Sequence, residues 1–430
     1  MKKKLIKLLS ILPLVFCLPA FAELSLTITK GQDTAQPIAI NSFDGNQGLS
    51  QNISEIISSD LQRSGKFSPL SQQDFPSKIS FTSNVNGQAW LDKGVNDILV
   101  GKIERDSSGQ YAISYKLIDA VKSTKSNSVV AQGLYRVQDK DLRRAAHTIS
   151  NVIYQKILNE KGAFNTKIAY VTQPNNKKWL LNIADYDGYN PKTLLTSSEP
   201  ILSPSWSPNL KDIAYSTFEN NKEKIYIVNM YSGKRVLISD ARGINSAPSF
   251  SPDGTKLALV LSKTGNAEIY IKNLMTGQLT QLTRGRSVNS EPSWSPDGNS
   301  IVFTSNRGGS PQIYKIDVSG SNVKRLTFEG RKNQNGRITP DGKTLINIRQ
   351  TNDGYHLVKQ NLETGATAIL TSTFLDQSPT VAPNGSMIIY TATYGNQQDL
   401  SMVSIDGRFA ARLPDSSGNA KFPSWSPFGK

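Results

Sequence analysis

The chain has 430 residues and a formal net charge of +15, from 49 Lys and Arg against 34 Asp and Glu. This length exceeds what one hydrophobic core usually serves, so we expect more than one domain. One cysteine and two histidines argue against a disulfide scaffold and against metal sites built from clustered histidine or thiolate ligands. A hydrophobic fraction of 37% suits a protein of many short strands joined by polar turns.

Residues 1–22 have the three parts of a secretory signal peptide. A segment with four lysines comes first, the apolar run Leu8–Leu18 follows, and Ala20-Phe21-Ala22 supplies a small-x-small cleavage site. The apolar run is too short for a stable transmembrane helix. We therefore expect an exported protein whose mature chain begins at Glu23.

Cys17, the only cysteine, lies inside this leader. A lipoprotein signal is the alternative, but the bulky Phe16 stands where a small residue is required before a lipid-bearing cysteine. We expect a mature chain without disulfides, thiolate metal ligands or a membrane span. Its formal charge, +11 once the leader's four lysines are removed, favours acidic protein faces or anionic envelope material as partners over nucleic acid.

The mature N-terminus alternates apolar and polar residues before the flexible stretch Gly31–Ala35. Such a segment forms a strand in its own protein, which is the more common use, or adds as a strand to the sheet edge of a partner. The candidate partner-binding residues are Glu23, Leu24, Leu26, Ile28 and Asp33.

Residues 23–162 are predicted to form a small α/β domain because strand and helix signals alternate along them. Pro37–Ile40 is a predicted strand, and residues 50–64 form a predicted helix with one apolar face and Gly65 after its end. Further strands are predicted at 97–100, 111–115 and 128–131, and a second helix at 139–160.

From residue 200 onward one phrase recurs, typically Pro-Ser-Trp/Phe-Ser-Pro followed by Asp-Gly. The second prolines of its six copies are spaced 44, 44, 44, 43 and 44 residues apart; they are Pro208, Pro252, Pro296, Pro340, Pro383 and Pro427. Each copy opens a unit of four strand signals separated by turns. Four antiparallel strands in this length are the size of a propeller blade, so residues 163–430 are predicted to form a six-bladed β-propeller.

The sixth copy has its first strand and no others, because the chain stops at Lys430. Residues 167–196 carry three strand signals that lack a first strand. The sequence therefore predicts a composite last blade, with strand one from the C-terminus and strands two to four from residues 167–196. Such closure removes the free sheet edges that make β proteins prone to association.

Few residues are candidates for catalysis. His147 falls off the apolar stripe of its helix and is expected to be solvated, while His356 lies in a strand of the fourth complete repeat. No Gly-x-Ser-x-Gly elbow and no Walker or Rossmann glycine pattern occurs, and the Asp-Gly pairs lack the flanking carboxylates of calcium loops. We therefore expect no enzyme activity, cofactor or metal.

The residues just before each predicted first strand should ring one mouth of the central channel, where the blades join. Any one of these segments could simply connect two blades, but as a set they are the best candidate for a binding site. The candidate residues are Ile244, Ala247, Ser290, Glu291, Asn335, Gln377 and Phe422.

The leader, the α/β domain and six Ser-Pro-Asp-Gly blades together resemble the TolB family, the periplasmic component of the Tol–Pal envelope system. The resemblance covers the whole chain and includes 261–265, 372–376 and 406–414. It implies a monomeric periplasmic adaptor whose propeller mouth binds the lipoprotein Pal, with Ala247, Ser290 and Glu291 among the contacts. Ile244 stands where some family members carry histidine.

The resemblance also implies that the segment Glu23–Asp33 binds TolA and folds back on its own protein, with the two binding events coupled. The implied role is outer-membrane integrity and constriction at cell division. Other outer-membrane lipoproteins and peptidoglycan are alternative partners. An exported propeller enzyme acting on peptides or glycans is the rival from another class, and it would need acidic residues or a metal in the channel.

Overall fold

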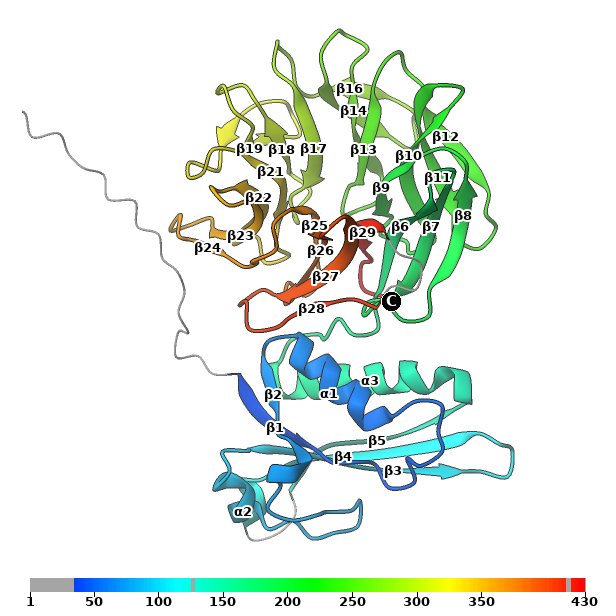
Figure 1. The fold of residues 1–430 in the computed structure, drawn as a ribbon, viewed down its shortest axis with the longest axis vertical. Helices are drawn as coiled ribbons and strands as arrows, with labels where there is room; N and C mark the ends of the chain where they lie inside the picture. The colour runs from blue at the N-terminus through cyan, green and yellow to red at the C-terminus, as the bar shows by residue number, and fades with distance from the viewer. Residues whose placement is uncertain (1–34, 125–127, 415–418, 430) are drawn as a thin grey trace, which may run out of the picture.

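The computed structural model describes residues 35–124, 128–414 and 419–429, and the predicted partner-binding segment Glu23–Asp33 lies outside them. A five-stranded sheet with helices forms the N-terminal part, and a ring of four-stranded sheets forms the rest (Figure 1). The predicted fold class, an α/β domain followed by a six-bladed propeller, is confirmed.

The sheet of the α/β domain has the strand order β2-β1-β3-β4-β5. β1 runs parallel to both of its neighbours, whereas β3, β4 and β5 form an antiparallel meander. The strands are β1 (Gln36–Ile40), β2 (Phe67–Pro69), β3 (Asp97–Arg105), β4 (Tyr111–Asp119) and β5 (Val129–Val137).

Two longer helices, α1 (Ile53–Arg63) and α3 (Leu142–Leu158), pack on each other and on this sheet. The Asn52 side chain caps α1 by accepting from the Glu55 N–H, which satisfies one of the free donors of the first turn. Gly65 follows α1 with φ +71°, as expected of a glycine after a helix end. The predicted helix at 139–160 consists of the 3-10 turn η3 (Asp139–Asp141) followed by α3. The sequence did not predict β2, the short helix α2 (Gly87–Leu91) or the 3-10 turns η1 (Gln72–Asp74) and η2 (Lys122–Thr124).

The propeller contains six antiparallel four-stranded sheets. The first three of its continuous blades are β9 (Ile201–Trp206), β10 (Asp212–Glu219), β11 (Lys222–Asn229) and β12 (Arg235–Ser239); β13 (Asn245–Phe250), β14 (Lys256–Leu261), β15 (Glu268–Asn273) and β16 (Leu279–Gln281); and β17 (Asn289–Trp294), β18 (Ser300–Ser305), β19 (Gln312–Asp317) and β20 (Lys324–Arg325). The next two are β21 (Asn333–Ile338), β22 (Thr344–Gln350), β23 (Tyr355–Asn361) and β24 (Thr367–Ile369); and β25 (Asp376–Val381), β26 (Met387–Tyr394), β27 (Gln397–Ser404) and β28 (Ala410–Arg412).

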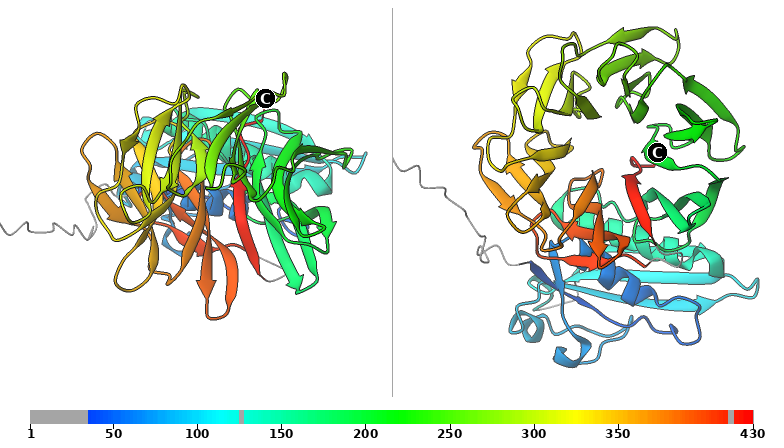
Figure 2. Two further views of the ribbon diagram at one scale, coloured as in Figure 1. Left: turned by 90° about the horizontal axis from the view of Figure 1, so that it is seen from above. Right: turned by 45° about the horizontal axis from the view of Figure 1, so that its top comes forward.

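The last blade is composite, as predicted. Strand β29 (Ala420–Trp425) pairs with β6 (Lys167–Asn175), which continues into β7 (Lys178–Asp185) and β8 (Lys192–Ser197). Neighbouring first strands contact one another all the way round, including β29 with β9, so the ring is closed (Figure 2).

The repeated phrase has a structural explanation. Each tryptophan of the β9 and β17 blades donates its indole N–H to a carbonyl of the preceding blade: Trp206 to Ser424 O at 3.0 Å and Trp294 to Ser249 O at 2.9 Å. In the turn after β13, Asp253 accepts from the Ser251 hydroxyl and from the Thr255 N–H, and these bonds lower the pKa of Asp253 to about 2. The phrase therefore joins blades and closes turns.

The α/β domain shares one hydrophobic core with the propeller. Ile53 and Ile149 of the helices belong to the same buried cluster as Met387 and Trp425 of the blades. The contacts lie at the turns where first strands end: Asn384, just after β25, donates to Lys161 O at 3.0 Å. The opposite face of the propeller, where first strands begin, is thus turned away from the α/β domain.

Candidate functional site

A cavity of about 290 Å³ opens in the central channel and is lined by residues from all six first strands. We call this cavity the mouth. Its lining residues are Ser203, Pro204, Ser205, Ala247, Pro248, Ser249, Glu291, Pro292, Gln334, Asn335, Arg337, Gln377, Ser378, Pro379, Thr380, Phe422, Pro423 and Ser424.

Six non-glycine residues with left-handed backbone form a ring in this lining. Every one interrupts the register between the first and second strand of its blade, so each is a β-bulge. They are Ser203 (φ 49°), Ala247 (48°), Glu291 (56°), Asn335 (55°), Ser378 (51°) and Phe422 (55°). Left-handed backbone costs a non-glycine residue roughly 1–2 kcal/mol, and strain of this kind concentrates at functional sites. The ring therefore marks the mouth as the candidate functional site.

Hydrogen bonds between blades hold three of these bulges. The Asn335 N–H donates to Glu291 Oε2 at 2.8 Å, and the Ser378 N–H donates to Asn335 Oδ1 at 3.4 Å. The Phe422 N–H donates to the Thr391 hydroxyl at 3.1 Å. These three bulges thus present an N–H to a side chain of the preceding blade, which preorganises that part of the mouth.

The mouth has two charged lining residues, Glu291 and Arg337. Glu291 Oε2 also accepts from the Thr304 hydroxyl at 2.6 Å, so this oxygen has two partners. Arg337 donates to the carbonyl of Gly336 at 2.9 Å. Burial lowers the pKa of Arg337, while the nearby Glu291 opposes this shift. The guanidinium is therefore a half-buried cation inside the channel.

Five of the predicted site residues line the mouth: Ala247, Glu291, Asn335, Gln377 and Phe422. The other two, Ile244 and Ser290, do not; Ile244 is exposed immediately before β13, and Ser290 lies in β17.

The expectation that these residues precede the first strands was wrong for all but Ile244. Four of the first strands begin three residues before the proline that was taken as their start; β13, for example, begins at Asn245 and not at Pro248. The bulge lets each strand continue through the kink. Sequence reasoning also missed Ser203, Ser378 and Arg337, although the repeat period marks Ser203 and Ser378 as equivalents of Ala247.

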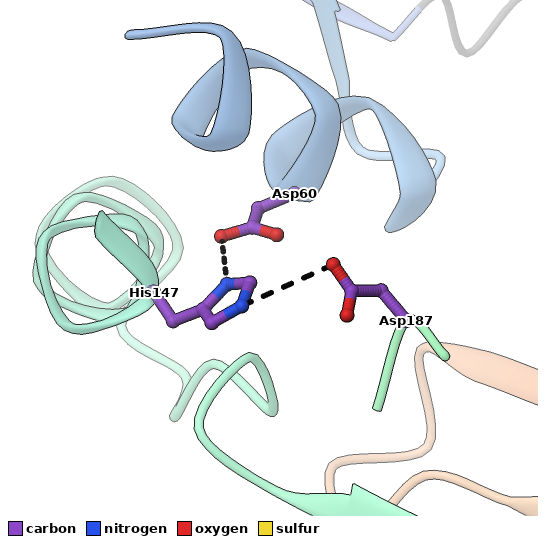
Figure 3. A group of neighbouring side chains, drawn as sticks. All are labelled: Asp60, His147 and Asp187. Carbon is purple, nitrogen blue, oxygen red and sulfur yellow. Dashed lines mark hydrogen bonds and ion pairs between the residues drawn. The ribbon is translucent and has the colours of Figure 1, made fainter. Parts of the chain in front are cut away.

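A second polar cluster joins the two domains (Figure 3). His147 of α3 is buried, which corrects the expectation of a solvated side chain. Its Nδ1 lies 2.8 Å from Asp60 Oδ2 of α1, and its Nε2 lies 3.9 Å from Asp187 Oδ2 in the turn after β7. Tyr186 donates to Asp60 Oδ1 at 2.6 Å. The prediction failed because the propeller covers the side of α3 that its own sheet leaves open.

Arginine side chains neutralise the carboxylates of this cluster. Asp60, His147 and Asp187 lie close enough to surround a small metal ion, but Arg63 and Arg143 already face Asp187 as ion pairs. Burial opposes a charge on the imidazole, yet the Asp60 carboxylate outweighs it and raises the pKa of His147. The cluster therefore acts as an electrostatic link between domains.

His356, the other histidine, lies in β23, far along the chain in a different domain from His147. It is buried, and its Nε2 is 3.2 Å from Asp353 Oδ1. The two histidines do not form a common site.

Two family models match this chain. The model described as the TolB amino-terminal domain matches residues 24–126, and the TolB beta propeller domain matches residues 154–429. The Tol-Pal system protein TolB of Haemophilus ducreyi is 48% identical over 430 residues, covering 100% of this chain and 99% of the relative. The chain belongs to the TolB family.

Other members agree with this assignment. The TolB of Histophilus somni strain 2336 is 52% identical over 414 residues, covering 95% of this chain and 94% of that protein. The crystal structure of TolB from Acinetobacter baumannii has a TM-score of 0.83 at 37% identity, covering 92% of this chain and 98% of that one. The resemblance to TolB seen in the sequence is thus confirmed, and the chain is a component of the Tol–Pal system of the cell envelope. Within the described residues, no helix has the length and apolarity needed to cross a membrane.

Proposed function

We propose that this TolB-family chain is a non-catalytic periplasmic adaptor that binds the lipoprotein Pal through the mouth. The observation that supports this most is the ring of six strained bulges. Backbone strain lowers the stability of the fold, and residues under such strain cluster at binding and active sites. A rigid concave surface with fixed polar groups suits binding of a protein segment. In this proposal TolA binds the segment Glu23–Asp33, and the complex supports outer-membrane integrity and constriction at division.

Calorimetry tests the proposal with the mature protein, residues 23–430, and the soluble part of Pal from the same organism. Wild type is expected to bind with one-to-one stoichiometry. Glu291→Arg is expected to abolish binding because it removes the acceptor of the Thr304 hydroxyl and the Asn335 N–H and places a longer side chain in the mouth. Glu291→Gln keeps an oxygen that accepts from Thr304 and Asn335, so it separates loss of charge from collapse of the bulge.

Glu363→Arg is the matched control, because Glu363 is exposed at the turn between β23 and β24 on the face opposite the mouth. It should bind like wild type. If Glu291→Arg still binds Pal, the adaptor role stands but the binding site lies outside the mouth. No binding by folded wild type at high micromolar concentration would refute the role itself.

A further inference from the structure

Four adjacent blades expose an apolar side chain on the face where their first strands begin. The connections into β13, β17, β21 and β25 carry these residues, and all four are large and exposed: Ile244 (42%), Val288 (50%), Phe328 (72%) and Phe374 (69%). We call them the apolar rim. Exposed aliphatic and aromatic groups repeated on one face are typical of protein interaction sites.

Basic side chains surround the apolar rim. They lie on the connections into β13, β17 and β21 and on the neighbouring turn after β14, and they are Arg242, Lys263, Arg284, Arg286, Arg331 and Lys332. In the part of the chain that the structure describes, none of the six is in an ion pair. Glu329, on the connection into β21, is already paired with Arg349 at 3.0 Å. Asp240 before β13 and Asp353 after β22 are further exposed carboxylates on this face. The six basic residues outnumber these carboxylates, so this part of the face carries a net positive charge.

Arg337 extends this positive charge into the mouth. Within the described residues its side chain donates to the Gly336 carbonyl, and Glu291, the carboxylate among the residues that line the mouth, is held by Thr304 and Asn335. Arg337 is half-buried in this lining, so an anion that enters the mouth meets a guanidinium that is only partly hydrated. A carboxylate that enters the mouth would form charge-assisted hydrogen bonds with the guanidinium, the strong class of such bonds.

We infer that this face recognises an acidic protein partner, which places one Asp or Glu side chain against Arg337 and apolar side chains against the rim. The inference rests on the proposed adaptor function and adds the chemistry that selects the partner. Apolar rim contacts supply buried area, whereas the basic residues orient the approaching partner and accelerate its association. Arg337 is then the specificity-determining residue of the mouth.

The test is calorimetry of wild type, Arg337→Gln and Arg337→Lys with the soluble part of Pal, at low and high salt. Arg337→Gln should weaken binding about tenfold or more, because a hydrogen-bonded charge pair is lost. The affinity of Arg337→Lys should lie between those of wild type and Arg337→Gln, because lysine keeps the positive charge but lacks the planar guanidinium that binds a carboxylate with two hydrogen bonds. Lys234→Gln removes the same charge from an exposed turn between β11 and β12 and should change the affinity less than about twofold. Melting temperatures establish that each variant is folded.

A second probe separates this inference from the adaptor role. It is the acetylated peptide Leu-Glu-Phe-Glu-Leu, compared with its glutamine twin. If Pal does not bind but wild type prefers the acidic peptide and Arg337→Gln loses that preference, the adaptor role fails and the acidic-partner site stands. If Pal binds wild type and Arg337→Gln equally, the inference is overturned while the role survives. Absence of any acidic preference, or binding of anionic phosphatidylglycerol vesicles that does not depend on Arg337, would also overturn it.

Discussion

Replacing Trp425 by alanine should destabilise the protein and uncouple its two domains. Trp425 is the tryptophan of the closing strand β29, and its side chain is buried. The ring stacks on Tyr186 with centroids 6.1 Å apart, and its indole N–H donates to the Thr166 hydroxyl at 2.7 Å. Tyr186 in turn donates to Asp60 of α1. Trp425 therefore supports both ring closure and the domain interface.

The magnitude follows from these contacts. Truncating a buried tryptophan to alanine costs about 3–5 kcal/mol, of which the indole hydrogen bond accounts for about 1 kcal/mol. Trp425→Phe keeps most of the apolar contact and should cost about 1–2 kcal/mol. Trp294→Ala is the matched control, since Trp294 is similarly buried but bonds to Ser249 O inside the ring, away from the α/β domain.

Urea unfolding monitored by far-UV circular dichroism measures the loss of stability. Thermal unfolding in a differential scanning calorimeter shows whether the two domains unfold together. Both alanine variants should lose comparable stability, but Trp425→Ala alone should separate the unfolding of the α/β domain from that of the propeller. A loss below about 1 kcal/mol would refute the burial argument. A single coincident transition in Trp425→Ala would refute the coupling.

Two further changes test the domain link and the bulges. Asp60 raises the folded-state pKa of His147 above the value of about 6.5 that applies in the unfolded chain. The stability contributed by the His147–Asp60 ion pair is therefore fully present below about pH 6.5 and is lost as the pH rises through the folded-state pKa. Unfolding free energies measured between about pH 5.5 and about pH 8.5 should show this decline in wild type and not in His147→Asn; an equal slope in both would contradict it. Ala247→Gly should raise the unfolding free energy by about 0.5–1 kcal/mol, because glycine adopts φ 48° without strain and loses only part of that gain to chain entropy. A lower midpoint in urea for Ala247→Gly would show that the bulge is not strained.

The repeat determined most of the architecture. The repeat has a period of about 44 residues, and its last copy lacks three of the four strands. A composite blade is the way to complete such a ring, and β29 does pair with β6. Residues at one position of a repeat occupy one position in the ring. For this reason, Ala247, Glu291, Asn335 and Phe422 could be placed at the mouth from sequence alone.

Tertiary structure decided the rest. Three of the bulges donate hydrogen bonds to the preceding blade, as the Asn335 N–H does to Glu291. A pairing between segments about 44 residues apart leaves no local signal in the sequence. The burial of His147 likewise depends on a surface from another domain, since the periodicity of a helix reveals the face it turns to its own core and not a second face covered by distant residues. The charge of Arg337 was visible in the sequence, but its isolation inside the channel follows from which neighbours the closed ring places around it.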